Sequence, residues 1–419
     1  MYVAIQPRVR ELEKGLRLDV GVEEIVEYLR TRNNTAAGLD DIEYDVLKRL
    51  FIRYEGGPLM VGSGRLKRPL DTPSLDRLRD WAAHAVRSLV VHGYFPDALK
   101  KGEVVPIFKS GDCTQPGNYR PITLMSCLYK LATAILAKRM LGICETAGAI
   151  SHLQGSGRTS QSCVNKVALV QNVIKHARRT GSELHLFSSD IRKAFDRVPY
   201  EAFEFSLVSL GFSEPTLEPF RNLQQAAAAC VRTPAGRTGF FHTLVGCRQG
   251  CSLSPLRFVL FMDLFLKHLD AMEIGYLYTF ETASAVADPL VPGAAFADDL
   301  VLLTGSAEDM QRVVTELDRF LGTFSMHLNP GKCEYRTRGR LSSDGPVPPV
   351  LVHGDDAAVH TVQDKGALEP FRYLGYWLAL DSRAFKGDPM YANHGAAVWA
   401  RHEAEVLKGF MERAQNSRG

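Results

Sequence analysis

Apolar side chains recur every three or four residues in much of the chain, and this spacing predicts amphipathic helices. The stretches with this pattern are residues 8–32, 42–52, 75–93, 128–140, 164–178, 198–211, 254–270, 306–320 and 396–413. Ser254-Pro255 is a favourable helix start, because serine can cap a helix and proline suits its first turn. Ser306 and Asp309 resemble a capping box at the start of another helix.

Shorter segments alternate apolar and polar residues or join two short apolar runs, which is typical of strands and hairpins. They are residues 103–124, 183–190, 231–246, 294–304 and 371–380, whereas the Gly- and Pro-rich residues 55–72 and 338–366 are expected to form loops. Helices come first, then helices alternate with short strands, and a helix ends the chain. This order predicts an α+β protein with an antiparallel sheet.

The composition of the 419 residues excludes several classes of protein. Hydrophobic residues make up 45% and charged residues 23%, which rules out wholesale disorder. No apolar run is long enough to cross a bilayer, and the first residues lack a secretion signal, so no membrane partner is expected. Eight cysteines without a CxxC pair favour a reduced, intracellular protein over a disulfide-bonded one.

The net charge of +3 conceals an uneven distribution of charges. Residues 98–197 hold 15 Lys and Arg against 6 Asp and Glu, a balance of +9, so the remainder of the chain carries −6. A basic segment beside an acidic remainder is expected where a polyanion is bound next to a carboxylate site. A solvated surface that happens to be basic is the alternative explanation.

Two acidic positions stand at the ends of predicted strands. Asp298 and Asp299 lie between two apolar runs, and Asp190 ends the alternating segment 183–190. Buried carboxylates lose hydration and repel each other, so the pair is either a solvated turn or a site for a divalent metal. Asp190 alone is equally well explained as the N-cap of a helix. If the two strands pair, three acids converge, which is the minimum needed to hold two Mg²⁺ ions for phosphoryl transfer.

An ordered series of sequence blocks resembles the reverse transcriptases of non-LTR retrotransposons. The blocks are residues 36–48, 100–112, 118–140, 154–164, 188–198, 246–263, 296–299, 328–335 and 371–378. The block at 296–299 reads FADD, the acidic hairpin typical of the family, and the block at 36–48 resembles a segment peculiar to the non-LTR group. So many blocks in the right order make a chance match very improbable.

The resemblance implies a right-hand polymerase with fingers and with an antiparallel palm sheet flanked by helices. We divide the chain accordingly into an N-terminal helical extension (1–95), fingers (96–182), a palm with the acidic hairpin (183–380) and a partial thumb or connecting helix (381–419). The chain stops soon after the last block and no endonuclease precedes the first, so we expect further retroelement domains or chains to supply thumb and endonuclease.

The resemblance also assigns the metal site. Asp190 and Asp298 correspond to the family's metal ligands, and Asp299 to a third acid in a supporting role. Successive strand residues point to opposite faces, so Asp298 and Asp299 reach one metal only if the turn twists them. Two Mg²⁺ ions are the expected cofactors, and Mn²⁺ can substitute for them.

Five further positions match residues that bind the incoming nucleotide in this family. Phe195 matches the wall on the 2′ side of the sugar, where a bulky ring favours deoxynucleotides; a core phenylalanine is the alternative. Lys109 and Arg120 match cations that meet the triphosphate, with surface charges as the alternative. Gln249 and Gly250 match the loop that packs against the nucleotide, where glycine permits close approach of the backbone.

Two basic residues complete the candidate site. Lys332 is the candidate proton donor to the leaving pyrophosphate, although a lysine after a Pro-Gly turn is most often simply solvated. Arg158 matches a residue that grips the template. Its block departs from the family, which usually has Phe where Gly157 stands and Arg where Gln161 stands, and this weakens the predicted grip.

The combined prediction is an RNA-directed DNA polymerase of a retroelement. Its partners would be an RNA template, a DNA primer and dNTPs, and its location would be intracellular, in the nucleus for a functional element. One alternative is an inactive, polymerase-like RNA-binding module or a decayed fragment, which the missing thumb favours and the three acids oppose. A maturase or a telomerase-like polymerase is another, but the block at 36–48 and the FADD sequence favour the retrotransposon group.

Overall fold

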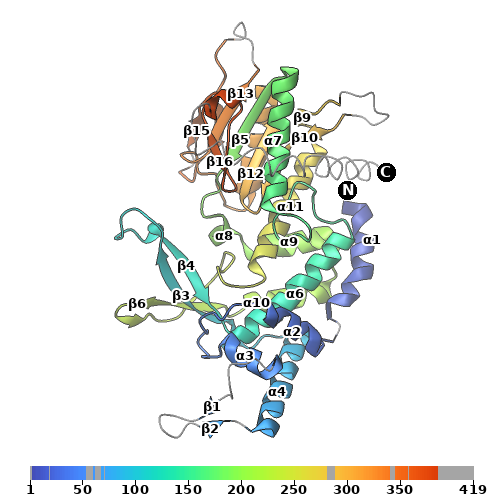
Figure 1. The fold of residues 1–419 in the computed structure, drawn as a ribbon, viewed down its shortest axis with the longest axis vertical. Coiled ribbons are helices and arrows are strands. Elements are labelled where there is room, and N and C mark those ends of the chain that lie inside the picture. The colour runs from blue at the N-terminus through green and yellow to red at the C-terminus, as the bar shows by residue number, and fades with distance from the viewer. Residues whose placement is uncertain are drawn as a thin grey trace. The chain divides into compact units, whose positions relative to one another are not determined.

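The computed structural model describes residues 2–17, 19–52, 60–61, 68–69, 71–280, 288–339, 345–356 and 358–385. The chain divides into two compact units, each built from separate stretches of sequence (Figure 1). We call residues 150–198 with 258–385 the hairpin unit, and residues 2–149 with 199–257 the helical unit. The predicted boundaries between extension, fingers, palm and thumb stay predictions. The helix predicted over 396–413 lies outside the described residues.

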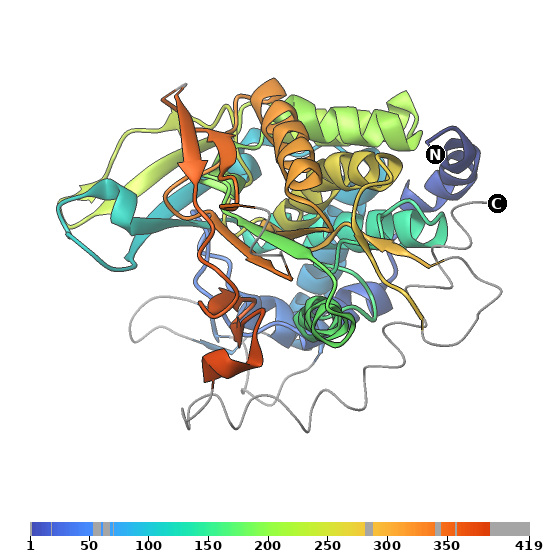
Figure 2. The same ribbon diagram turned by 90° about the horizontal axis from the view of Figure 1, so that it is seen from above.

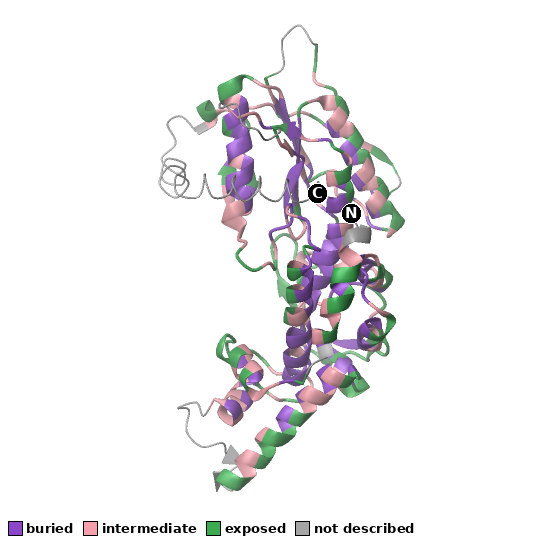
Figure 3. Cartoon of the chain, turned by 90° about the vertical axis from the view of Figure 1, so that its right-hand side faces the viewer, coloured by how far each residue is buried: buried purple, intermediate pink, exposed green. Residues whose placement is uncertain are grey.

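The hairpin unit is built around a four-stranded antiparallel sheet. Its strands, in spatial order, are β11 (Gly293–Phe296), β12 (Asp299–Thr304), β5 (Leu184–Ser189) and β13 (Glu334–Arg338). Helix α7 (Cys163–Thr180) lies on one side of the sheet, and α11 (Ser254–Ala271) and α12 (Ala307–Thr323) lie on the other (Figure 2). Because both faces are covered, the central strands β12 and β5 are almost continuously buried (Figure 3). The predicted α+β class is confirmed.

Shorter elements complete the hairpin unit. They are β9 (Tyr276–Leu277) with β10 (Leu290–Val291), β14 (Val350–His353) with β15 (Val359–Val362), β16 (Phe371–Tyr373) with β17 (Tyr376–Leu378), the one-turn helix α8 (Ala194–Arg197) and a 3-10 helix at Ser382–Phe385. The loop predicted over 338–366 is therefore partly wrong. Val350, Val352 and Val362 are buried in the β14–β15 hairpin, which packs on α12. The strands alternate buried and exposed residues, but the Gly, Pro and Asp residues around them indicated a loop.

The helical unit consists mainly of helices. They are α1 (Tyr2–Leu12), α2 (Val22–Arg30), α3 (Tyr44–Phe51), α4 (Thr72–His92), α5 (Asp97–Lys100), α6 (Cys127–Thr146), α9 (Tyr200–Leu210) and α10 (Glu214–Gln224), with 3-10 helices at Glu13–Arg17 and Pro116–Asn118. None of the helices in the described part of the chain combines the length and apolarity needed to cross a membrane.

Two predictions for the helical unit are wrong in detail. The single helix expected over residues 8–32 is divided into α1, a 3-10 helix and α2. At the division, the Asp19 carboxylate accepts a hydrogen bond from Val20 N (2.8 Å), a local bond that competes with helix continuation. Within the loop expected over residues 55–72, β1 (Met60–Val61) pairs with β2 (Arg68–Pro69).

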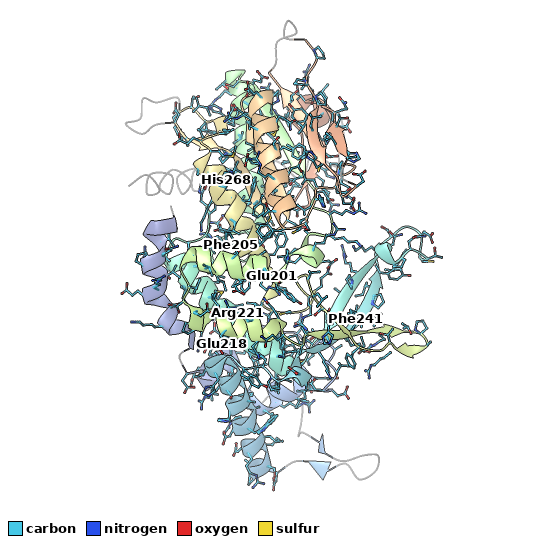
Figure 4. The ribbon with its side chains drawn as sticks, turned by 180° about the vertical axis from the view of Figure 1, so that it is seen from behind. Glu201, Phe205, Glu218, Arg221, Phe241 and His268 are labelled. Atoms are coloured by element: carbon cyan, nitrogen blue, oxygen red, sulfur yellow. The ribbon has the colours of Figure 1, made fainter. Side chains whose placement is uncertain are left out.

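Helices α9 and α10 pack against each other in the helical unit. Phe203 and Phe220 form the contact, with ring centroids 5.5 Å apart and ring planes at 85°. Glu201 and Phe205 of α9 and Glu218 of α10 are exposed on their outer sides (Figure 4). The buried rings therefore fix the helix pair, while the outer faces remain in contact with solvent.

The sheet of the helical unit is held by a buried acid. Its strands are β4 (Tyr119–Leu124), β3 (Lys101–Phe108), β6 (Ala228–Thr233), β7 (Gly236–Arg237) and β8 (Phe241–His242). Glu103 on β3 forms ion pairs with Arg232 (2.5 Å) and Arg237 (2.7 Å) from β6 and β7. Hydrogen bonds from these two arginines lower the pKa of Glu103 to about 2, because they stabilise the charged carboxylate.

We expect Glu103→Gln to cost about 2 kcal/mol of unfolding free energy at pH 7, because the pairs with two half-exposed arginines are lost. The pKa of Glu103 is lower in the folded state, so its contribution is fully present above pH 4.5 and is lost as the pH falls towards 2. Urea unfolding of both proteins at pH 7, 4 and 3 measures this. A difference that persists unchanged at the lowest pH would contradict the assignment.

Candidate functional site

The three predicted acids meet at one end of the sheet in the hairpin unit. Strands β11 and β12 pair from Phe296 opposite Asp299, so Ala297 and Asp298 form a two-residue turn. Ser189, the last residue of β5, pairs with Leu300. Asp190 therefore follows directly beside the start of β12, and the strand pairing that the sequence analysis required is present.

A second strand connection holds Asp190 in place. Asn329 donates a hydrogen bond from Nδ2 to Asp190 Oδ2 (2.9 Å), and its backbone N donates to the Asp190 carbonyl (2.7 Å). Ile191 bridges to Leu328, which extends this contact along the chain. Asn329 lies in the sequence block 328–335 but was not predicted as a site residue. Only the fold brings this turn beside the end of β5.

The electrostatics of the acids follow from their crowding. Burial and the negative charge of Asp190 raise the pKa of Asp298. Partial loss of hydration, followed by the charges of Asp298 and Asp190, raises the pKa of Asp299 to about 6, although the residue is exposed. No Lys or Arg in the described ranges forms an ion pair with any of the three. Their repulsion is the condition that a bound cation would relieve.

The donor set suits a hard divalent cation. Three carboxylates offer oxygen ligands of the kind that Mg²⁺ prefers, and only one oxygen of Asp190 is occupied, by the Asn329 amide. Across the described ranges, no group of three or more His, Cys, Asp or Glu side chains is already arranged as a metal cluster. Strand pairing places the three residues at one end of the sheet, so they fit the ions by chemistry and position, with the ligand role still a prediction.

Two further candidates of the hairpin unit lie near Asp190 or its partner in sequence, since Phe195 follows Asp190 by five residues and Lys332 follows Asn329 by three. The Phe195 ring is half-buried and stacks on Phe258, with centroids 4.4 Å apart and planes at 15°. Lys332 is exposed in the turn between Asn329 and β13, and its backbone N donates to the Asn329 carbonyl (2.9 Å). Lys332 therefore lies in the same turn as Asn329, the residue that is hydrogen-bonded to Asp190.

Arg158 has a structural function within its own loop. Its Nη1 donates to the carbonyls of Ser151 (3.1 Å) and Gln154 (3.4 Å). The neighbouring Gly157 has φ 66°, a left-handed conformation that phenylalanine adopts only with strain. This conformation is a physical reason for the departure at that position. Template binding by Arg158 stays a prediction.

The four remaining candidates belong to the helical unit. Lys109 and Arg120 are exposed near the turn between β3 and β4, where Lys109 N donates to Asn118 O (2.9 Å). The carbonyl of Gln249 accepts a hydrogen bond from Thr123 N (2.6 Å). Gly250 has φ 125°, and a Cβ there would lie 2.2 Å from Thr123 O. Glycine is therefore required at position 250 by packing on β4, whether or not a nucleotide is bound.

Comparisons with known proteins show which family the chain is similar to. A family model described as reverse transcriptase (RNA-dependent DNA polymerase) matches residues 100–378. The Pol polyprotein of the R2 retrotransposable element of Popillia japonica is 27% identical over 308 residues, which cover 70% of this chain and 40% of that protein. The RNA-directed DNA polymerase from the Drosophila melanogaster mobile element jockey is 22% identical over 366 residues, 85% of this chain and 37% of that protein.

A solved structure is also similar to the chain. Apo telomerase from Candida tropicalis, truncated of its C-terminal domain, superposes with a TM-score of 0.43 and 14% sequence identity, covering 63% of this chain and 55% of that one. The chain spans two fifths or less of the curated relatives named above. The family match covers well over half of this chain, and the predicted resemblance to non-LTR retrotransposon polymerases is confirmed. The chain belongs to the reverse transcriptase (RNA-dependent DNA polymerase) family.

Proposed function

We propose that this chain is the polymerase portion of a retroelement and extends the 3′-hydroxyl of a DNA primer along an RNA template with dNTPs. The observation that carries the proposal is the position of Asp190 beside Asp298 and Asp299 of the β11–β12 hairpin, with three carboxylates and no pairing cation among the described residues. A protein that only bound RNA would gain nothing from repulsive carboxylates facing a polyanion.

Asp190, Asp298 and Asp299 would hold the divalent ions that the family generally uses, which we take to be two Mg²⁺, with Mn²⁺ as a substitute. Bound there, the ions would lower the charge barrier to attack by the primer 3′-oxygen and to departure of pyrophosphate. Asn329 would keep Asp190 in one orientation through its amide. Lys332, exposed in the adjoining turn, would supply a proton to the leaving pyrophosphate.

The remaining residues would act on the nucleic acids and the nucleotide. Phe195, held by its stack on Phe258, would exclude a ribose 2′-hydroxyl. Lys109 and Arg120 would neutralise the triphosphate, and Gln249 and Gly250 would form a firm wall for the nucleotide, since their loop is hydrogen-bonded to β4. We expect most nucleic-acid contacts to be made with phosphates and binding to weaken steeply with salt.

The setting of the reaction follows from the same proposal. All eight cysteines are free, which is consistent with a reducing, intracellular environment, and a functional retroelement would act in the nucleus. Further retroelement domains or chains that carry a thumb and an endonuclease belong to the same proposal as partners of this portion.

Primer extension with purified protein on poly(rA)/oligo(dT) tests the function directly. We expect DNA synthesis that requires Mg²⁺ or Mn²⁺, stops with EDTA and declines as salt is raised. A matched reaction on a DNA template measures the preference for RNA. Retained RNA binding without any synthesis would instead favour the inactive binding module or decayed copy.

A further inference from the structure

We propose that Gln154 is a positioning residue that holds the acidic hairpin in its working conformation. The inference rests on the proposed function of that hairpin, and it concerns a residue whose side-chain oxygen contacts backbone N–H groups. Gln154 lies in the loop between residues 150 and 162, far from the hairpin in sequence, and its side chain is completely buried.

The Gln154 side chain contacts the backbone of the turn itself. Its Oε1 accepts a hydrogen bond from Ala297 N (3.0 Å), the residue immediately before Asp298, and a second from Ser156 N (3.0 Å). Ala297 has φ 56°, a left-handed conformation that is unfavourable for alanine. The hydrogen bond therefore holds the residue whose backbone angle sets the direction of Asp298.

The backbone around Gln154 adds to this contact. Gly155 N donates to Ala295 O (2.9 Å), and Ala295 N donates to Leu153 O (3.0 Å), so the loop pairs with the free edge of β11. Such pairing satisfies the edge strand and fixes the loop along the hairpin. This backbone pairing therefore fixes Gln154 beside the turn of the hairpin.

The loop is in turn anchored to the buried helices of the hairpin unit. Ser151 N donates to Asp263 Oδ1 (2.6 Å), and Asp263 forms a buried ion pair with Lys267 (2.7 Å), both on α11. Lys166 of α7 donates to the carbonyl of His152 (2.6 Å). Helices on both sides of the sheet thus hold the loop that carries Gln154, which suits a rigid support for the acids.

The chemistry of glutamine explains why this residue type stands here. Two backbone N–H groups converge on one side-chain oxygen, so the amide cannot be flipped without placing donors against donors. The Nε2 group is buried without a hydrogen-bond partner among the described residues, which costs stability. The two hydrogen bonds to Oε1 offset part of this loss. A neutral acceptor also avoids a fourth negative charge beside the acids.

The test replaces Gln154 with methionine, which has similar length but no acceptor, and measures three quantities. We expect Mn²⁺ affinity, followed by electron paramagnetic resonance, to fall about tenfold, as for other outer-shell supports of metal ligands. The kcat of primer extension should fall 10- to 100-fold with KM for dNTP changed less than twofold. Hydrogen exchange at residues 296–300 should accelerate.

Gln171→Met is the matched control, because Gln171 lies on α7 of the same unit and its Oε1 makes no hydrogen bond within the described residues. Mn²⁺ affinity, kcat and hairpin exchange of folded Gln154→Met within twofold of this control would overturn the inference. If Gln154→Met fails to fold, Gln154→Asn keeps the amide but is too short to reach Ala297. An unchanged Mn²⁺ affinity and exchange rate in that variant would overturn it equally.

The readouts separate this inference from the proposed function. A wild-type chain that makes no DNA would refute the polymerase assignment, while faster hairpin exchange and weaker Mn²⁺ binding in Gln154→Met would still support the positioning contact. An active wild type with an unaffected Gln154→Met would refute the contact and leave the polymerase assignment intact.

Discussion

Replacing Asp298 with asparagine is expected to reduce the rate of DNA synthesis about 1,000-fold or more, which corresponds to about 4 kcal/mol of transition-state stabilisation. The amide keeps the shape of the side chain but removes the charge that would hold a divalent ion. Asp190→Asn should have a similar effect, since Asp190 occupies the adjacent strand position. Primer extension in single-turnover format measures both losses.

The same substitution should increase stability in the absence of metal. Burial and the charge of Asp190 raise the pKa of Asp298, so the ionised group is unfavourable in the folded state, and a neutral amide removes that cost. Thermal unfolding in EDTA should show a higher Tm for Asp298→Asn than for wild type. RNA binding should not weaken, because the substitution removes a negative charge that repels the polyanion.

Asp356→Asn is the matched control, because Asp356 is an exposed aspartate of the same unit that forms an ion pair with His360 (3.0 Å) and accepts a hydrogen bond from Ala358 N (3.1 Å). We expect it to retain activity within a factor of two. Synthesis that survives in Asp298→Asn would refute the metal assignment, whatever the effect on stability.

The core of the fold could be predicted because its signals are local. The run from residue 294 to 304 is apolar on both sides of an acidic pair, and it forms the β11–β12 hairpin as expected. Ser306 caps α12 by accepting a hydrogen bond from Asp309 N (3.1 Å), as its spacing indicated. At Asp19 a local side-chain hydrogen bond accompanies the end of one helical segment. The helical spacing of apolar residues nevertheless continues into the next helix, so the sequence pattern does not reveal the break.

The supports of the candidate site could not be predicted for a different reason. Gln154 and Asn329 act through side-chain hydrogen bonds to residues more than 100 positions away in sequence. Nothing in local propensity or periodicity reports such a contact, since both residues lie in loops whose paths depend on the packing of the sheet. Arg158 illustrates the opposite difficulty. The resemblance predicts that it binds the template, but the structure also shows its guanidinium donating a hydrogen bond to the Ser151 carbonyl of its own loop.

Phe195→Ala is the second substitution with a large expected effect, on the choice of sugar rather than on the rate. Phe195 follows Asp190 by five residues, and its ring is held parallel to Phe258. A wall fixed by stacking rejects a 2′-hydroxyl sterically, whereas alanine leaves room for it. The ratio of kcat/KM for dNTP over rNTP should fall about 100-fold, equivalent to about 2.7 kcal/mol.

Two controls separate the wall from an ordinary core phenylalanine. Phe195→Ala should also cost about 2–3 kcal/mol of stability, because it removes a half-buried stacked ring, and a purely structural residue would show only that loss. Phe258→Leu removes the stacking partner but keeps the Phe195 ring, so it should destabilise the unit while reducing sugar discrimination by a smaller factor. Discrimination that is unchanged in folded Phe195→Ala, or equally reduced in both variants, would assign the ring to the core, because a ring that meets the sugar contributes more to selection than its stacking partner does.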